Sequence, residues 1–168
     1  IKECGGKYYA KCDADKRNQL TIYNNALETA KTVNKPLLVI YGFDQCAPCI
    51  HLDNSIKAAT KEGYNIEDHF VVVKILAIGN KSVKKVNKAL SVNPRSYPTG
   101  FLVNPSTNVV VEVHIQGGVK YDTNDKPVPI TNNKSAQAFI NETVDWIRNT
   151  GGATIIDSMK VTSDETND

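Results

Sequence analysis

Two cysteines, Cys46 and Cys49, are the residues of this 168-residue sequence with the clearest capacity for chemistry. They stand in the stretch FDQCAPCI, separated by Ala47 and Pro48. A C-x-x-C pair can carry out thiol–disulfide exchange, supply half of a structural zinc site, or form a short structural disulfide. The elements on either side of the pair bear on which chemistry applies.

The cysteine pair follows a predicted buried strand and opens a predicted helix. LLVIYGF, residues 37–43, is apolar throughout, as is typical of a strand covered on both faces. Apolar residues then recur at helical spacing, which predicts a helix over 46–61. The free N–H groups and dipole of a helix start favour a thiolate, and a second thiol three residues on can attack a mixed disulfide. Pro48 suits a first turn, because an N–H group at that position would have no acceptor within the helix and its absence costs nothing.

The other two chemistries have weaker support in the sequence. Zinc needs two further ligands, normally a second C-x-x-C or a spaced histidine pair, and His51, His69 and His114 show no such spacing. His51 is interpreted as a solvated helix residue. We expect no metal and no cofactor beyond the redox-active pair Cys46–Cys49 itself. A structural disulfide stays open, although closing so short a loop removes little chain entropy.

The rest of the pattern predicts one α/β domain with extensions at both ends. An N-terminal extension is expected over 1–19, the domain over 20–150, and a C-terminal tail over 151–168 that is polar from residue 157 onward. Within the domain, residues 119–134 are rich in Pro, Asn and Asp and are expected to form an irregular insertion.

The order of predicted elements implies a mixed sheet. Strand–helix–strand connections give parallel pairing, and a hairpin adds antiparallel strands. We therefore expect a three-layer fold whose central sheet of about four strands has helices on both faces. The other predicted elements are helices over 20–33, 83–90 and 135–149, and strands over 70–76, 99–103 and 109–115.

Composition and charge are those of an ordinary globular protein. Hydrophobic residues make up 40% and charged residues 23%, and the net charge is +2, too small to indicate nucleic acid or an anionic membrane. No apolar run reaches the length of a membrane span. The first residue is Ile1, which fits either a cleaved signal peptide or a start chosen for other reasons. The cysteines fall into two close pairs, as expected in an oxidising compartment.

From about residue 20 to 149 the sequence resembles the thioredoxin-like family. KPLLVIYGFDQCAPC is similar to that family's central strand and active-site motif, and VVVKIL to its next strand. SYPT, residues 96–99, is similar to the cis-proline segment, and Gly117 to the glycine that ends the following hairpin. The resemblance implies a thioredoxin-like three-layer fold and a protein thiol–disulfide oxidoreductase.

The family's roles carry over to four residues. Cys46 corresponds to the nucleophile and Cys49 to the more buried resolving thiol. Pro98 is expected to follow a cis peptide bond and to face the cysteines with a surface that lacks an N–H donor. The backbone of Tyr97 is expected to pair with an extended substrate segment. The expected partners are protein thiols or disulfides and a redox-recycling protein.

Departures from the family pattern mark residues that would tune the site. Gln45 replaces the Trp that precedes the first cysteine in thioredoxins, and the dipeptide between the cysteines is Ala47-Pro48 rather than Gly-Pro. Ile40 replaces a buried acid, while Lys74 stands where that acid's lysine partner would be. A lysine on a buried strand must extend its amine to solvent or find another partner.

The approach to the motif resembles the thioredoxin-like modules of exported thiol–disulfide interchange proteins. We therefore expect an exported protein of the bacterial periplasm. Cys4 and Cys12 are expected to form a disulfide with each other, the alternative being an auxiliary redox pair that passes electrons to Cys46. The direction of electron flow is left open, and the alternative function is a binding module whose Cys46–Cys49 disulfide is not catalytic.

Overall fold

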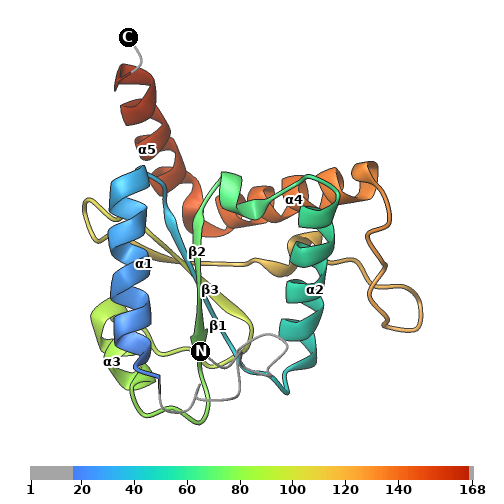
Figure 1. The fold of residues 1–168 in the computed structure, drawn as a ribbon, viewed down its shortest axis with the longest axis horizontal. Helices are drawn as coiled ribbons and strands as arrows, with labels where there is room; N and C mark the ends of the chain where they lie inside the picture. The colour runs from blue at the N-terminus through green and yellow to red at the C-terminus, as the bar shows by residue number, and fades with distance from the viewer. Residues whose placement is uncertain (1–16, 167–168) are drawn as a thin grey trace.

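The computed structural model describes residues 17–166 (Figure 1), with side chains described up to residue 159. A mixed sheet lies at its centre, with the strand order β2-β1-β3-β4. β1 (Leu37–Gly42) pairs in parallel with β2 (Val71–Leu76) and antiparallel with β3 (Thr99–Val103). β4 (Val110–Val113) pairs antiparallel with β3. This is the four-stranded mixed sheet of a thioredoxin-like fold, as the sequence predicts.

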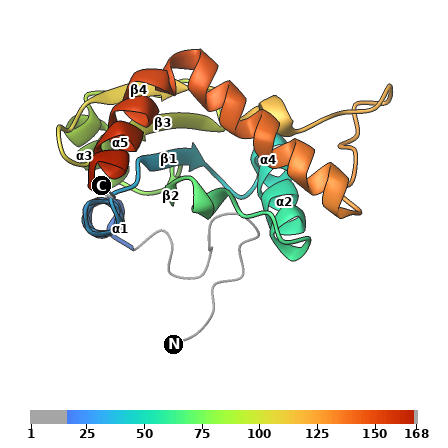
Figure 2. The same ribbon diagram turned by 90° about the horizontal axis from the view of Figure 1, so that it is seen from above.

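Helices cover both faces of the sheet and give three layers (Figure 2). α1 and α3 pack on one face, and α2 and α4 on the other. β1 is buried along its whole length because it lies between both helix layers. The bounds of the helices are α1 (Gln19–Val33), α2 (Ala47–Lys61), α3 (Val83–Leu90), α4 (Asn133–Ile147) and α5 (Ala153–Thr166), with short helical turns at Ile66–Asp68, Gln116–Gly118 and Arg148–Gly152.

The alternation of side chains along β1 builds a separate core on each face. Leu38 and Ile40 point to the α2 and α4 layer, where they join Cys49. Leu37, Val39 and Tyr41 point to the α1 and α3 layer. Successive strand residues face opposite sides of a sheet, so an unbroken apolar run fills both cores at once.

The C-terminal stretch differs from the predicted polar tail. Gly151 interrupts the helix with a φ of 140°, in the region that favours glycine, and α5 then continues from Ala153. Ile155 and Met159 are buried on the α2 and α4 side of the core. The prediction rested on the polar character of the stretch and missed that these apolar residues recur at helical spacing. Residues 1–16 of the predicted N-terminal extension, which include Cys4 and Cys12, lie outside the described residues.

Residues 119–134 leave the sheet and project beside α2 (Figure 1). The segment has no strand or helix before α4 begins, apart from a single bridge between Tyr121 and Pro127. Hydrogen bonds from Asp122 N to Lys126 O (2.8 Å) and from Val128 N to Lys120 O (2.7 Å) hold this turn together. The predicted irregular insertion is thus a compact, hydrogen-bonded turn.

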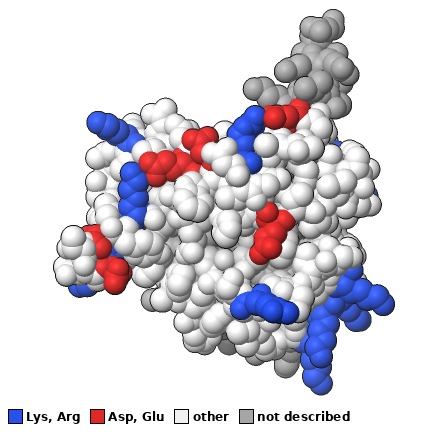
Figure 3. Space-filling view, turned by 180° about the vertical axis from the view of Figure 1, so that it is seen from behind, with Lys and Arg blue, Asp and Glu red and all other residues white. Residues whose placement is uncertain are grey.

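Two surface properties complete the description of the fold. Among residues 17–166, no helix has the length and apolar character required to cross a membrane. On the face of the molecule seen in Figure 3, basic and acidic side chains are interspersed and lie mostly toward the margins. That distribution agrees with the small net charge of +2.

Candidate redox site at the start of α2

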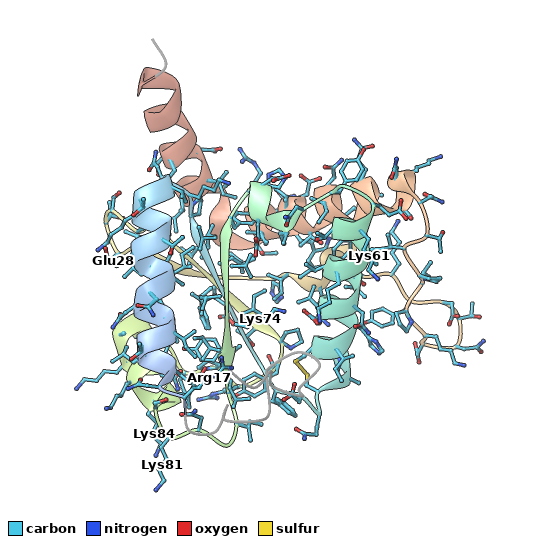
Figure 4. The ribbon with its side chains drawn as sticks, in the orientation of Figure 1. Arg17, Glu28, Lys61, Lys74, Lys81 and Lys84 are labelled. Atoms are coloured by element: carbon cyan, nitrogen blue, oxygen red, sulfur yellow. A yellow bond between two sulfur atoms is a disulfide. The ribbon has the colours of Figure 1, made fainter. Side chains whose placement is uncertain are left out.

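The Cys46–Cys49 pair lies at the connection between β1 and α2. β1 ends at Gly42, and after three connecting residues Cys46 is the N-cap of α2. The two cysteines form a disulfide, with 5.2 Å between their Cα atoms. Figure 4 shows this bond at the end of α2 that lies next to the carboxyl end of β1. A strand that ends beside a helix start thus presents two sulfur atoms at one edge of the sheet.

The sulfur of Cys46 takes the place of a capping side chain. The backbone N–H of Cys49 donates to Cys46 Sγ over 3.3 Å, as the N–H groups of a first turn donate to Ser or Asp at other helix starts. Ile50 N donates to Cys46 O over 3.0 Å and begins the helical hydrogen bonds. A thiolate formed at Cys46 on reduction would meet this N–H group and the positive end of the helix dipole, so the geometry favours its ionised form.

The two sulfurs differ in access. Cys46 is 6% exposed, whereas Cys49 is fully buried among apolar side chains of the α2 and α4 core. Cys46 is therefore the more accessible of the two cysteines, as the attacking thiol of an exchange pair has to be.

The start of β3 brings a second segment to the disulfide. Tyr97 O lies 3.7 Å from Cys46 Sγ, and the peptide bond between Tyr97 and Pro98 is cis. The Tyr97 ring packs edge-on against Phe43, with centroids 5.8 Å apart. Thr99 then pairs with Tyr41, so the pairing of β3 with β1 fixes the position of the Tyr97–Pro98 segment beside the cysteines.

Lys74 has a buried partner that the sequence analysis missed. The amine of Lys74, whose side chain is labelled in Figure 4, forms an ion pair with Asp53, a residue of α2 that is 1% exposed. Lys57, one turn further along α2, lies 2.8 Å from the other carboxylate oxygen. Ile40 and Lys74 are register partners in β1 and β2, so Lys74 faces α2 rather than a carboxylate on β1. The signal was available, because Asp53 follows Cys49 at helical spacing on the face that also carries Leu52.

The remaining predicted tuning residues lie around the disulfide. Gln45, Ala47 and Pro48 are exposed and border Cys46 in the chain. Pro48 O accepts a hydrogen bond from Gln116 Nε2 over 3.3 Å, so the turn after β4 also touches the site. The influence of these residues on the redox potential stays a prediction.

The histidines lie apart from one another and each contacts an aromatic ring. His51 on α2 packs edge-on against Tyr121 at 5.9 Å between centroids, so the 119–134 segment lies next to α2 and His51 is not fully solvated. Within residues 17–166, no three His, Cys, Asp or Glu side chains lie close enough together to hold a metal ion.

Comparison with known proteins gives a limited result. No protein-family model matches the chain, and no curated protein matches it. Among solved structures, the chain is similar to a disulphide isomerase from Xylella fastidiosa Temecula1, with 22% identity and a TM-score of 0.42 over 88% of this chain and 92% of that chain. We therefore derive the function from the geometry of the site.

Proposed function

We propose that this protein is a thiol–disulfide oxidoreductase that exchanges disulfides with protein substrates. One observation carries the proposal. The Cys46–Cys49 disulfide lies at the start of a helix that follows a buried strand, and Sγ of Cys46, the more exposed of the two cysteines, lies 3.7 Å from Tyr97 O. A purely structural disulfide requires neither a helix N-terminus nor a second segment of the chain beside its sulfur.

In the reducing direction the reaction has two exchange steps. The Cys46 thiolate attacks one sulfur of a substrate disulfide, and the other substrate sulfur leaves as a thiolate. Cys49, losing its proton, then attacks Cys46 Sγ and releases the second substrate thiolate. The enzyme dithiol has become a disulfide, and two electrons have passed to the substrate. In the oxidising direction the same steps run in reverse.

The surroundings of the disulfide supply the other roles. We assign the backbone of Tyr97 to pairing with an extended substrate segment, which would hold a substrate cysteine in line with Cys46. Pro98 would present an apolar surface without an N–H donor. Gln45, Ala47 and Pro48 would form the rim that a substrate or a recycling partner meets. We place the protein in an exported compartment, the bacterial periplasm, on the resemblance of its motif region to exported interchange modules.

Two single substitutions test the assignment of the cysteines. In assays with a quenched peptide disulfide, Cys46→Ser is expected to abolish exchange, and Cys49→Ser to accumulate a mixed disulfide that mass spectrometry detects. Turnover retained by Cys46→Ser would show that the assigned nucleophile is wrong.

Equilibration with glutathione then separates the remaining possibilities. The reduction potential of the Cys46–Cys49 pair, measured against glutathione, gives the direction of exchange. A difference of about 30 mV corresponds to roughly 1.4 kcal/mol for this two-electron couple. A Cys46–Cys49 bridge that resists excess dithiothreitol would instead favour a binding module with a non-catalytic disulfide.

A further inference from the structure

A hollow of about 360 Å³ opens next to the redox site, between the start of β3, the end of β4 and α4. Its lining includes Pro98, Glu112, His114, Gln116, Gly117 and Trp146.

The hollow is joined to the redox site through two of these residues. Pro98 follows Tyr97, whose carbonyl oxygen is 3.7 Å from Cys46 Sγ. Gln116 donates a hydrogen bond to Pro48 O, inside the C-x-x-C motif. A residue in an extended strand advances about 3.3 Å, so a substrate with its cysteine at Cys46 would carry side chains into the hollow a few residues away.

An exposed indole forms one wall. The Trp146 side chain is 48% exposed, although large aromatic residues usually bury most of their surface. Its ring lies directly on Gly117, where an added Cβ would come within 1.9 Å of the ring. The absence of a side chain at Gly117 therefore lets the indole lie flat against the turn.

Further contacts hold that wall in place. His114 packs edge-on against the Trp146 ring at 6.3 Å between centroids. Thr150 Oγ1 accepts from His114 N over 2.8 Å and donates to Trp146 O over 2.5 Å, which ties the end of β4 to the end of α4. The indole is thus held in place by its neighbours while it lines the hollow and keeps about half of its surface exposed.

The charge at the hollow selects one class of ligand. Among the lining residues, Glu112 is the acidic one, and no Lys or Arg lies among them. The face of an indole attracts cations through its quadrupole, and the attraction grows when the cation is partly desolvated. A lysine or arginine side chain can lay its apolar stem along the ring while its charged end reaches a carboxylate.

We propose that this pocket receives a lysine or arginine side chain of the substrate polypeptide, a few residues from the cysteine that reacts with Cys46. The inference rests on the proposed function, because it names the class of substrate for that site. Trp146 and Glu112 are specificity-determining residues that contact the substrate and take no part in the exchange itself.

A binding experiment tests the pocket independently of catalysis. Trp146 is the one tryptophan in the sequence, so intrinsic tryptophan fluorescence reports on this pocket alone. The full chain carrying Cys46→Ser and Cys49→Ser would be titrated with otherwise identical peptides that hold lysine, arginine, norleucine or glutamate at one position. That position would be scanned from one to three residues on either side of a serine that replaces the reactive cysteine.

We expect lysine and arginine peptides to change the fluorescence and to bind about tenfold more tightly than the norleucine and glutamate peptides at one position of the scan. Glu112→Gln is expected to reduce that preference severalfold. The matched control is Glu28→Gln, since Glu28 is an exposed carboxylate on α1 whose loss should leave the preference unchanged. Equal binding of norleucine and lysine peptides, tighter binding of glutamate peptides, or no fluorescence change with any peptide would overturn the inference.

Turnover of the matching peptide disulfides by the unmodified protein separates this inference from the proposed function. Exchange at equal rates with lysine, norleucine and glutamate substrates would refute the pocket assignment while the oxidoreductase activity stands. Selective binding of lysine peptides without any exchange would refute the proposed activity while the pocket assignment stands. A kcat/KM higher by about tenfold for lysine substrates, lost in Trp146→Leu without a change in reactivity toward dithiothreitol, would support both.

Discussion

The substitution Lys74→Met tests whether the ion pair between β2 and α2 stabilises the fold. Asp53 is 1% exposed, and a carboxylate so deeply buried has to be compensated by nearby charge. Methionine retains the approximate length and apolar stem of lysine and removes the amine. In the variant, Asp53 keeps its ion pair with Lys57, whose Nζ lies 2.8 Å from the carboxylate.

The expected loss follows from the exposure of the lysines. Breaking a buried ion pair by removing one partner costs about 3–5 kcal/mol. The Lys74 side chain is 31% exposed and Lys57 stays in place, so solvent screening and the second lysine both reduce that cost. We expect Lys74→Met to lower the free energy of unfolding by about 1–2 kcal/mol. Lys57→Met, with a side chain that is 59% exposed, should cost about 0.5 kcal/mol or less.

Urea denaturation of the oxidised protein measures these differences. With a slope of about 2 kcal/mol per molar urea, in the middle of the usual range, Lys74→Met should lower the midpoint by roughly 0.5–1 M. Removing both charges in Asp53→Leu with Lys74→Met should cost less than the sum of the two single variants, by about 1 kcal/mol or more. A Lys74→Met midpoint equal to that of the unmodified protein, or strictly additive single and double variants, would refute the assignment of a coupled buried pair.

Four further outcomes are expected. In the reduced protein, Cys46 should react with iodoacetamide at pH 6.5 faster than Cys49, as peptide mapping can show, because it alone caps α2. Tyr41→Phe should leave stability unchanged or raise it by up to about 1 kcal/mol in urea denaturation, since within residues 17–166 the buried hydroxyl has no hydrogen-bond partner. Burial, and then the neighbouring Tyr23 and Tyr97, raise the pKa of Tyr41 above its ordinary value, so the folded state holds this proton more tightly than the unfolded state. Stability should therefore fall as the pH rises above about 10, and less steeply in Tyr41→Phe, as denaturation at several alkaline pH values can measure. Gly118→Ala should cost about 1–3 kcal/mol in thermal or urea unfolding, because its Cβ would lie 2.3 Å from Thr143 Oγ1.

The sequence predicts the redox pair and its supporting elements because each leaves a local pattern. The apolar run 37–43 is continuous since both of its faces are covered, and the spacing after Cys49 has the period of a helix. Together these patterns place the cysteines at a helix start. The resemblance of SYPT to a cis-proline segment adds Tyr97, which the pairing of β3 with β1 then brings to Cys46.

Residues that meet only through tertiary packing are harder to predict. In the sequence, Asp53 is an ordinary polar residue of an amphipathic helix. Its ion pair with Lys74 becomes evident only from the register of β1 and β2, which places the lysine on the side of α2. Trp146 likewise belongs to a helix whose period is clear, but its exposure depends on the turn at Gly117, which lies far away in the sequence. α5 was not predicted although Ile155 and Met159 recur at helical spacing, because the polar residues from 157 onward favoured a tail.

The position of Asp53 changes the meaning of the departure at Ile40. Isoleucine at that strand position does not remove the buried acid from the site, because an acid reaches Lys74 from the helix layer instead. The ion pair consequently joins β2 to α2, the helix that carries both cysteines, rather than joining two strands of the sheet. Asp53 lies one helical turn beyond Cys49, where side chains four residues apart are about 5–6 Å from each other at Cβ. The ion pair between Lys74 and Asp53 therefore holds α2 against β2 close to the point where the helix carries the Cys46–Cys49 disulfide.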